Sequence, residues 1–220
     1  MNNTKLTCSD IVAILQKVAI DMTEHIGELR DLDAASGDGD LGVTVELSSK
    51  AMTTYLNGPD ETDTGKMLAK LGMNTNQISP STFGTLLASA FLSAGKAVQG
   101  KPEITTDDLV LMGLGAIDGI KKRGKAEVGD KTMLDSLVPA VKTFKEGIDE
   151  KTDICGALKA AVLAAEAGTL ATENMRAKFG RAAYRQDGCL GIRDAGAAAM
   201  YFLITSFSIH LTARIKENIQ

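Results

Sequence analysis

Apolar residues recur at helical spacing along most of the chain, and this period restricts its fold more than any other feature. After the helix-start pair Ser9 and Asp10, apolar positions repeat every three or four residues, whereas polar residues take the other face. Further apolar stripes follow polar turns and begin near residues 42, 64, 85, 106, 133, 155 and 195. The short connections predict an all-α fold, a single antiparallel helical bundle or barrel spanning residues 1–220.

The composition agrees with closely packed helices and excludes several function classes. Aromatic residues make up 4% of the chain and tryptophan is absent, which disfavours a sheet sandwich. The net charge of −4 argues against a nucleic-acid partner. The three cysteines are scattered, so we expect neither a disulfide nor a zinc site, as is typical of a cytoplasmic protein. The N-terminus lacks the order of a signal peptide, and the apolar run 195–209 is too short to cross a bilayer, so we expect no membrane contact.

Three carboxylates lie within eight residues, and glycines separate them: Asp33, Asp38 and Asp40. Acids placed this closely repel one another unless a cation joins them, and a hard divalent ion such as Mg²⁺ prefers oxygen ligands. Gly37 and Gly39 allow the backbone to turn sharply and direct the side chains to one point. The helix expected to follow has free N–H groups that favour an anion. The stretch therefore predicts a metal beside phosphate groups, as in a nucleotide site.

Surface turns and other ligand-binding loops also combine aspartate with glycine. An Asp-Gly-Asp sequence is common in plain surface turns. An EF-hand calcium loop requires a glutamate at its twelfth position, which is Thr44 when the loop is counted from Asp33. The spacing also differs from a Walker loop and from a dinucleotide fingerprint.

Three motifs follow one another along nearly the whole chain: DAASGDGDLG at 33–42, RGKAEVGDKTMLD at 123–135, and GRAAY with RDAGA at 180–184 and 193–197. Together they resemble the nucleotide-binding L subunit (DhaL/DAK2-type) of bacterial dihydroxyacetone kinase. The resemblance implies a barrel of antiparallel helices with ADP or ATP at its mouth and Mg²⁺ on the three aspartates. We expect the nucleotide to contact Leu41, Gly42, Val43, Thr44, Ile78, Ser79, Gly124, Met133, Arg181, Asp194, Ala195 and Gly196.

The resemblance also implies a reaction, phosphoryl transfer from the nucleotide to a ketose held on a separate K subunit. A phosphotransferase-system M component would transfer a new phosphoryl group to bound ADP, although the family also contains ATP-dependent members. The sequence does not decide whether the protein forms a homodimer. The sequence predicts no catalytic nucleophile or general base, in keeping with an acceptor on another chain. Two alternatives remain: an ATP-dependent kinase subunit for a related ketose such as a tetrulose, and a non-catalytic regulator that responds to the nucleotide.

The sequence departs from the family pattern at three places. Leu41 stands where histidine is common, and Ala195 stands where the family has proline. Residues 76–80 read NQISP in place of the glycine-rich GGASG, and a backbone without glycine cannot approach phosphate in the same way. We expect the backbone N–H groups of Leu41, Gly42 and Thr44 to stay available to phosphate. Lys131 is a further candidate phosphate ligand.

Overall fold

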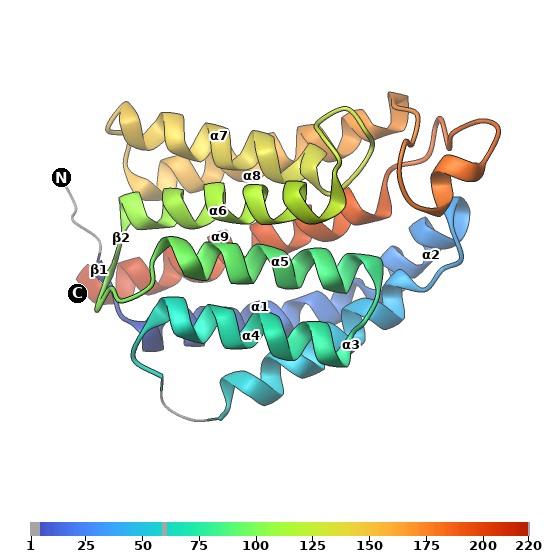
Figure 1. Cartoon of the computed structure of the whole chain (residues 1–220). Helices are drawn as coiled ribbons and strands as arrows, with labels where there is room; N and C mark the ends of the chain where they lie inside the picture. The colour runs from blue at the N-terminus through green and yellow to red at the C-terminus, as the bar shows by residue number, and fades with distance from the viewer. Residues whose placement is uncertain (1–4, 59–60, 220) are drawn as a thin grey trace.

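The computed structural model describes residues 5–58 and 61–219, and it confirms the all-α prediction. Long helices run back and forth, with the two termini at one end of the bundle (Figure 1). The helices are α1 Cys8–Asp21, α2 Ile26–Ser36, α3 Leu41–Leu56, α4 Thr64–Ile78, α5 Thr82–Ala97, α6 Thr106–Gly124, α7 Leu134–Asp149, α8 Ile154–Ala171 and α9 Ala195–Ile219. Short 3-10 turns occur at η1 Met22–His25, η2 Thr172–Asn174 and η3 Arg181–Tyr184.

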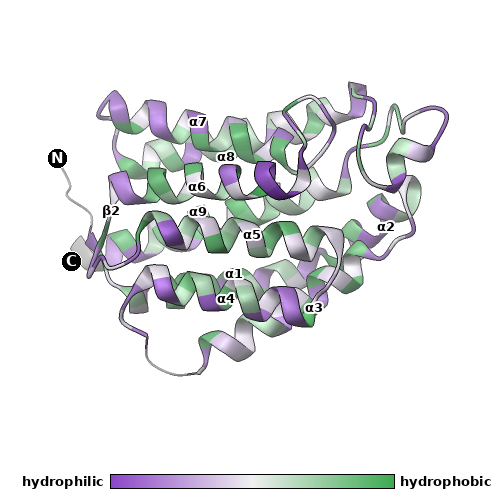
Figure 2. Cartoon of the chain, in the orientation of Figure 1, coloured by the Kyte–Doolittle hydropathy of each residue, from purple (hydrophilic) through white to green (hydrophobic). Residues whose placement is uncertain are grey.

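The helices close into a ring. Each of α3 to α8 packs against the next helix in sequence, and α9 and α3 both pack against α1. A two-residue antiparallel pairing of β1 Lys5–Leu6 with β2 Ile104–Thr105 ties the N-terminal segment to the start of α6. Apolar and polar residues alternate along the helices, as the sequence pattern predicts (Figure 2).

Caps place several helix starts and correct two of our predictions. The first helix begins at Cys8 and not after Ser9, because Thr7 and Asp10 form a reciprocal capping box. The fifth helix begins at Thr82 and not after Thr85, because the Ser81 hydroxyl accepts a hydrogen bond from the backbone N–H of Gly84.

Small residues allow the helices to approach closely. A Cβ atom added at Gly65 in α4 would lie 2.5 Å from the carbonyl oxygen of Gly95 in α5. A Cβ added at Gly119 in α6 would lie 2.3 Å from the carbonyl oxygen of Ser89. Neighbouring backbones are therefore in direct contact, which agrees with the alanine- and glycine-rich composition.

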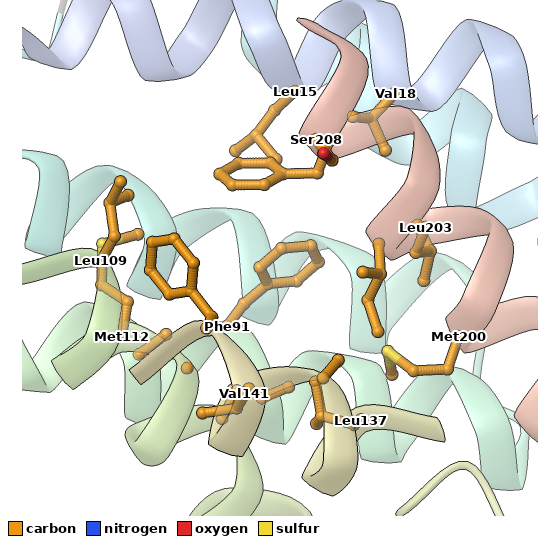
Figure 3. A pocket seen from close by; sticks show the side chains of 18 of the residues that line it. Leu15, Val18, Phe91, Leu109, Met112, Leu137, Val141, Met200, Leu203 and Ser208 are labelled. Carbon is orange, nitrogen blue, oxygen red and sulfur yellow. The ribbon is translucent and has the colours of Figure 1, made fainter. Parts of the chain in front are cut away.

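An apolar cavity of about 240 Å³ lies inside the ring. Side chains from α1, α5, α6, α7 and α9 point into it, including Leu15, Phe91, Leu137 and Leu203 (Figure 3). The cavity lies in the bundle interior and its lining differs entirely from that of the polar cavity at the loop end.

Within the described residues, two helices are long and apolar enough to cross a membrane by length and composition alone, over Ile154–Asn174 and Ala195–Glu217. The helix that carries the predicted apolar run 195–209 is longer than that run, and its candidate span covers 23 residues. Core helices pass the same test, and both helices are members of the ring, since α8 packs against α7 and α9, and α9 packs against α1.

Candidate functional site: an aspartate cluster at a polar cavity

The three aspartates meet at one point at the loop end of the bundle. Asp33 lies in the last turn of α2, and Asp38 and Asp40 lie in the turn before α3. One carboxylate oxygen from each residue lies within 4.8 Å of the others. The turn depends on Gly39, whose φ of +75° is a conformation that glycine adopts readily. The backbone N–H of Leu41 donates a hydrogen bond of 3.1 Å to Asp33 Oδ2 and fixes that side chain.

Arg181 reaches this cluster from a distant part of the chain. It begins η3, and its guanidinium forms an ion pair with Asp38 and lies 3.7 Å from Asp40. One guanidinium offsets one of three negative charges, so the cluster retains a charge of about −2 when all three aspartates are ionised. Oxygen donors with this excess charge suit a hard divalent cation such as Mg²⁺.

A polar cavity of about 610 Å³ opens beside the cluster. Four segments far apart in sequence form its wall: the α2–α3 turn, the α4–α5 loop, the loop before α7, and residues 179–196. Figure 1 shows these connections gathered at the end of the bundle opposite the termini. The residues of the wall that the sequence also predicts are Asp33, Asp38, Asp40, Leu41, Thr44, Lys131, Met133, Arg181, Asp194, Ala195 and Gly196.

A second cavity of about 420 Å³ adjoins the first. The two share Pro80, Leu86 and Met133 among their lining residues. Gly124, at the C-terminal end of α6, lines the second cavity only. A Cβ atom at Gly124 would come within 3.1 Å of the Leu86 side chain. Met133 and Gly124, which the sequence predicts to contact a nucleotide, thus lie along one continuous hollow.

The N-terminus of α9 faces the polar cavity. Asp194 accepts a hydrogen bond of 2.7 Å from the backbone N–H of Ala197, and the Asp194 N–H donates one of 2.9 Å to the Thr172 hydroxyl. A Cβ at Gly196 would lie 3.1 Å from the Asp194 carboxylate. The first turn of α9 therefore adds the positive end of a helix dipole to the wall.

The family assignment comes from comparison with known proteins. The model of the DAK2 domain matches residues 35–208, a span that includes Asp38, Asp40, Arg181 and the start of α9. The chain belongs to the DAK2 family.

Relatives of two lengths resemble this DAK2 protein. It is 31% identical over 181 residues to the PEP-dependent dihydroxyacetone kinase ADP-binding subunit DhaL of Escherichia coli, covering 82% of this chain and 86% of the relative. A second DhaL subunit, from Listeria innocua, is 30% identical over 193 residues, covering 87% of this chain and 89% of the relative. The mouse triokinase/FMN cyclase is 31% identical over 198 residues, with 88% of this chain but 33% of the relative covered.

Among solved structures, the dihydroxyacetone kinase of C. freundii in complex with AMP-PNP and Mg²⁺ shares the fold. Its TM-score is 0.68 at 23% identity, over 90% of this chain and 33% of the other. The DAK2 protein thus spans most of a bacterial DhaL subunit and about a third of the longer kinases it matches.

Four residues that the sequence predicts at the nucleotide do not line either cavity of the DAK2 protein. Gly42 faces α2, where an added Cβ would lie 2.9 Å from the carbonyl oxygen of Ile26. Val43 and Ile78 are exposed outside the two cavities. Ser79 is buried, and its hydroxyl donates to the carbonyl oxygen of Thr44 at 3.2 Å.

Two of the backbone donors expected for phosphate are already used. The Leu41 N–H is bound to Asp33, and the Thr44 N–H donates to the Asp40 carbonyl oxygen at 3.0 Å. That prediction was therefore wrong for Leu41 and Thr44, because the turn and the first turn of α3 use these groups. Several wall residues were not predicted as site residues, namely Thr82, Phe83, Thr132, Phe179 and Tyr184, although Thr132 and Tyr184 lie within two of the three motifs. Thr82 and Phe83 lie in the polar stretch 74–85, which is the one signal that could have found them.

Burial gives Asp194 a testable pH dependence. Removal from water raises the pKa of its carboxyl group to about 7, against about 3.9 in an unfolded chain. The folded state then holds the extra proton between about pH 4 and pH 7, so this group's contribution to the unfolding free energy falls as pH rises through that range. We expect Asp194→Asn, which keeps a capping oxygen, to flatten this slope.

Urea unfolding between pH 4 and pH 8, with EDTA present, measures this slope. The exposed cap of α8, Asp153, provides the matched control Asp153→Asn. An unchanged slope in Asp194→Asn would contradict the assignment.

Proposed function

We propose that this protein is the nucleotide-binding subunit of a dihydroxyacetone-type kinase and takes up Mg²⁺ with ADP or ATP in the polar cavity. Asp33, Asp38 and Asp40 would hold one or two Mg²⁺ ions, which neutralise charge on the phosphates and in the transition state. The observation that carries the proposal is the convergence of these carboxylates within 4.8 Å beside a 610 Å³ cavity.

The surrounding groups support a polyphosphate oriented along the wall. Arg181 supplies a guanidinium that suits phosphate oxygens, and the first turn of α9 supplies N–H groups and a positive dipole end. The adjoining cavity at Gly124 and Met133 would receive the base, with the Met133 side chain as an adaptable apolar surface. Four predicted residues lie outside both cavities and would only support the backbone of the site: Gly42, Val43, Ile78 and Ser79.

The acceptor belongs on a partner protein. The cavity wall carries carboxylates that suit a metal, and we assign no nucleophile or general base to it. Two relatives of nearly full length are named ADP-binding subunits of PEP-dependent kinases, so we propose a ketose-binding K subunit as the partner in the cytoplasm. A phosphotransferase M component would restore the phosphoryl group on bound ADP.

A transfer assay with a ketose-binding subunit tests the proposal and its alternatives. Dihydroxyacetone and the K subunit are combined with this protein and either ATP or phosphoenolpyruvate with the phosphotransferase components. We expect Mg²⁺-dependent sugar phosphate with the second donor set. Product with ATP alone, or only with a tetrulose, would favour the ATP-dependent kinase. Tight nucleotide binding without product from any donor would favour the non-catalytic regulator. The glycine-free segment 76–80 is the feature that supports this alternative.

A further inference from the structure

Lys131 is a buried lysine whose donors are all in use. Its residue is 2% exposed, and its ammonium donates hydrogen bonds to three backbone carbonyl oxygens, of Thr172 at 2.7 Å, Cys189 at 2.8 Å and Ile192 at 2.5 Å. An ammonium has three N–H donors, so none remains for a phosphate. The prediction that Lys131 is a phosphate ligand was therefore wrong, and burial of the amine lowers its pKa.

The three carbonyls belong to the two ends of one loop. Residues 173–192, here called the arginine loop, follow Thr172, the first residue after α8, and lead to α9, with Arg181 near the middle. Lys131 contacts Thr172 directly before the loop and Cys189 and Ile192 at its end. The ends are joined further by a 2.8 Å hydrogen bond from the Gly191 N–H to the Glu173 carbonyl oxygen.

Apolar packing contributes little to the position of this loop. Of residues 173–192, all within the described part of the chain, only Gly188 and Cys189 are buried. The large side chains of Phe179, Tyr184 and Leu190 are 38%, 91% and 45% exposed. A segment with so little buried surface opens easily unless polar contacts hold it.

We propose that Lys131 is a positioning residue, whose ammonium fixes both ends of the arginine loop and thereby holds Arg181 over the aspartate cluster. The preceding residue strengthens the attachment, because the Asp130 carboxylate accepts a 2.6 Å hydrogen bond from the Lys178 ammonium and the Asp130 carbonyl accepts one from the Lys178 N–H. The loop before α7 is thus the support on which the arginine loop rests. The effect of this attachment on nucleotide binding rests on the proposed function.

The chain offers a matched pair of lysines for the test. Lys131 and Lys151 both have a left-handed backbone, with φ of 63° and 61°, and they flank α7 at opposite ends, but Lys151 is exposed. Methionine replaces either lysine with a side chain of similar length and no donor. Lys131→Met and Lys151→Met therefore differ mainly in the loss of the three carbonyl contacts.

Amide hydrogen exchange without nucleotide tests the attachment by itself. We expect Lys131→Met to raise exchange in 173–192 by about 10-fold or more, the effect of losing one charged hydrogen bond, while α4 and α5 keep their protection. Lys151→Met should exchange as the wild type does. Unchanged exchange in the loop of Lys131→Met would overturn the proposal, whether or not the protein binds ADP.

A double-mutant cycle on Mg²⁺-ADP affinity tests whether Lys131 acts through Arg181. We expect Lys131→Met to weaken binding about 10- to 100-fold, the range for partners that orient metal-site groups. In the Arg181→Ala background the same change should cost less than about 3-fold, because the group it positions is gone. Equal losses in both backgrounds would overturn the proposal. Absence of Mg²⁺-ADP binding by the wild type would instead refute the proposed function and leave the exchange result to decide the attachment.

Discussion

Asp38→Asn is expected to weaken Mg²⁺-dependent ADP binding by more than about 100-fold. Loss of a residue that only supports a metal ligand changes metal affinity about 10- to 100-fold, and loss of a direct ligand should cost more. The substitution keeps the shape of the side chain but removes one of three charges that meet within 4.8 Å. The same change should not lower thermal stability. It relieves repulsion among the aspartates, and the ion pair that it removes, between Asp38 and Arg181, is largely exposed and contributes little.

Calorimetry with ADP, in the presence of Mg²⁺ and of EDTA, measures this effect. Asp31→Asn is the matched control, because Asp31 lies two residues before Asp33 but is exposed and paired with Arg30 at 3.1 Å. Affinity within about 3-fold of the wild type in Asp38→Asn would remove this residue from the metal site, as would an equal loss in the control.

Gly168→Ala is expected to destabilise the fold by about 3 kcal/mol, at the upper end of the cost of overpacking. A Cβ atom at Gly168 in α8 would lie 2.0 Å from the carbonyl oxygen of Asp135 in α7, so the two helices must separate. The same aspartate organises the cavity wall, since its carboxylate accepts hydrogen bonds from the backbone N–H groups of Gly129 and Thr132 at 2.5 and 2.7 Å. The substitution should therefore weaken ADP binding as well as the fold.

Thermal unfolding should show a fall in Tm of about 6–12 °C for Gly168→Ala. Gly27→Ala is the control, because a Cβ at Gly27 would meet no atom within 4 Å. That substitution should leave Tm unchanged or raise it slightly, as expected when alanine replaces a helical glycine without strain. A Tm for Gly168→Ala equal to that of the wild type would mean that α7 and α8 are not in backbone contact.

The parts of the fold that depend on neighbouring residues could be predicted from the sequence. The aspartate cluster is local, because Asp33, Asp38 and Asp40 are joined by one short turn. The cap at Thr105 follows from a residue type in a short pattern, as does that at Asp153. Helical periodicity marked the long elements for the same reason.

The parts that depend on distant segments could not be predicted. The sequence predicts Lys131 as a candidate phosphate ligand. The three carbonyl groups that bind its ammonium lie 41, 58 and 61 residues away in sequence, so the local pattern gives no sign of them. Ser79 looked available to phosphate, but its partner is the Thr44 carbonyl, 35 residues earlier. Arg181 was predicted from the family resemblance of the GRAAY motif, whereas its position beside Asp38 requires the closed ring of helices.

A crystal structure of the protein with Mg²⁺ and ADP tests the central claim most directly. We expect density for a metal ion in contact with oxygens of Asp33, Asp38 and Asp40 and with the diphosphate, and density for the base beside Met133. A diphosphate bound away from these aspartates, or aspartate side chains turned to solvent in the presence of saturating Mg²⁺-ADP, would contradict the account.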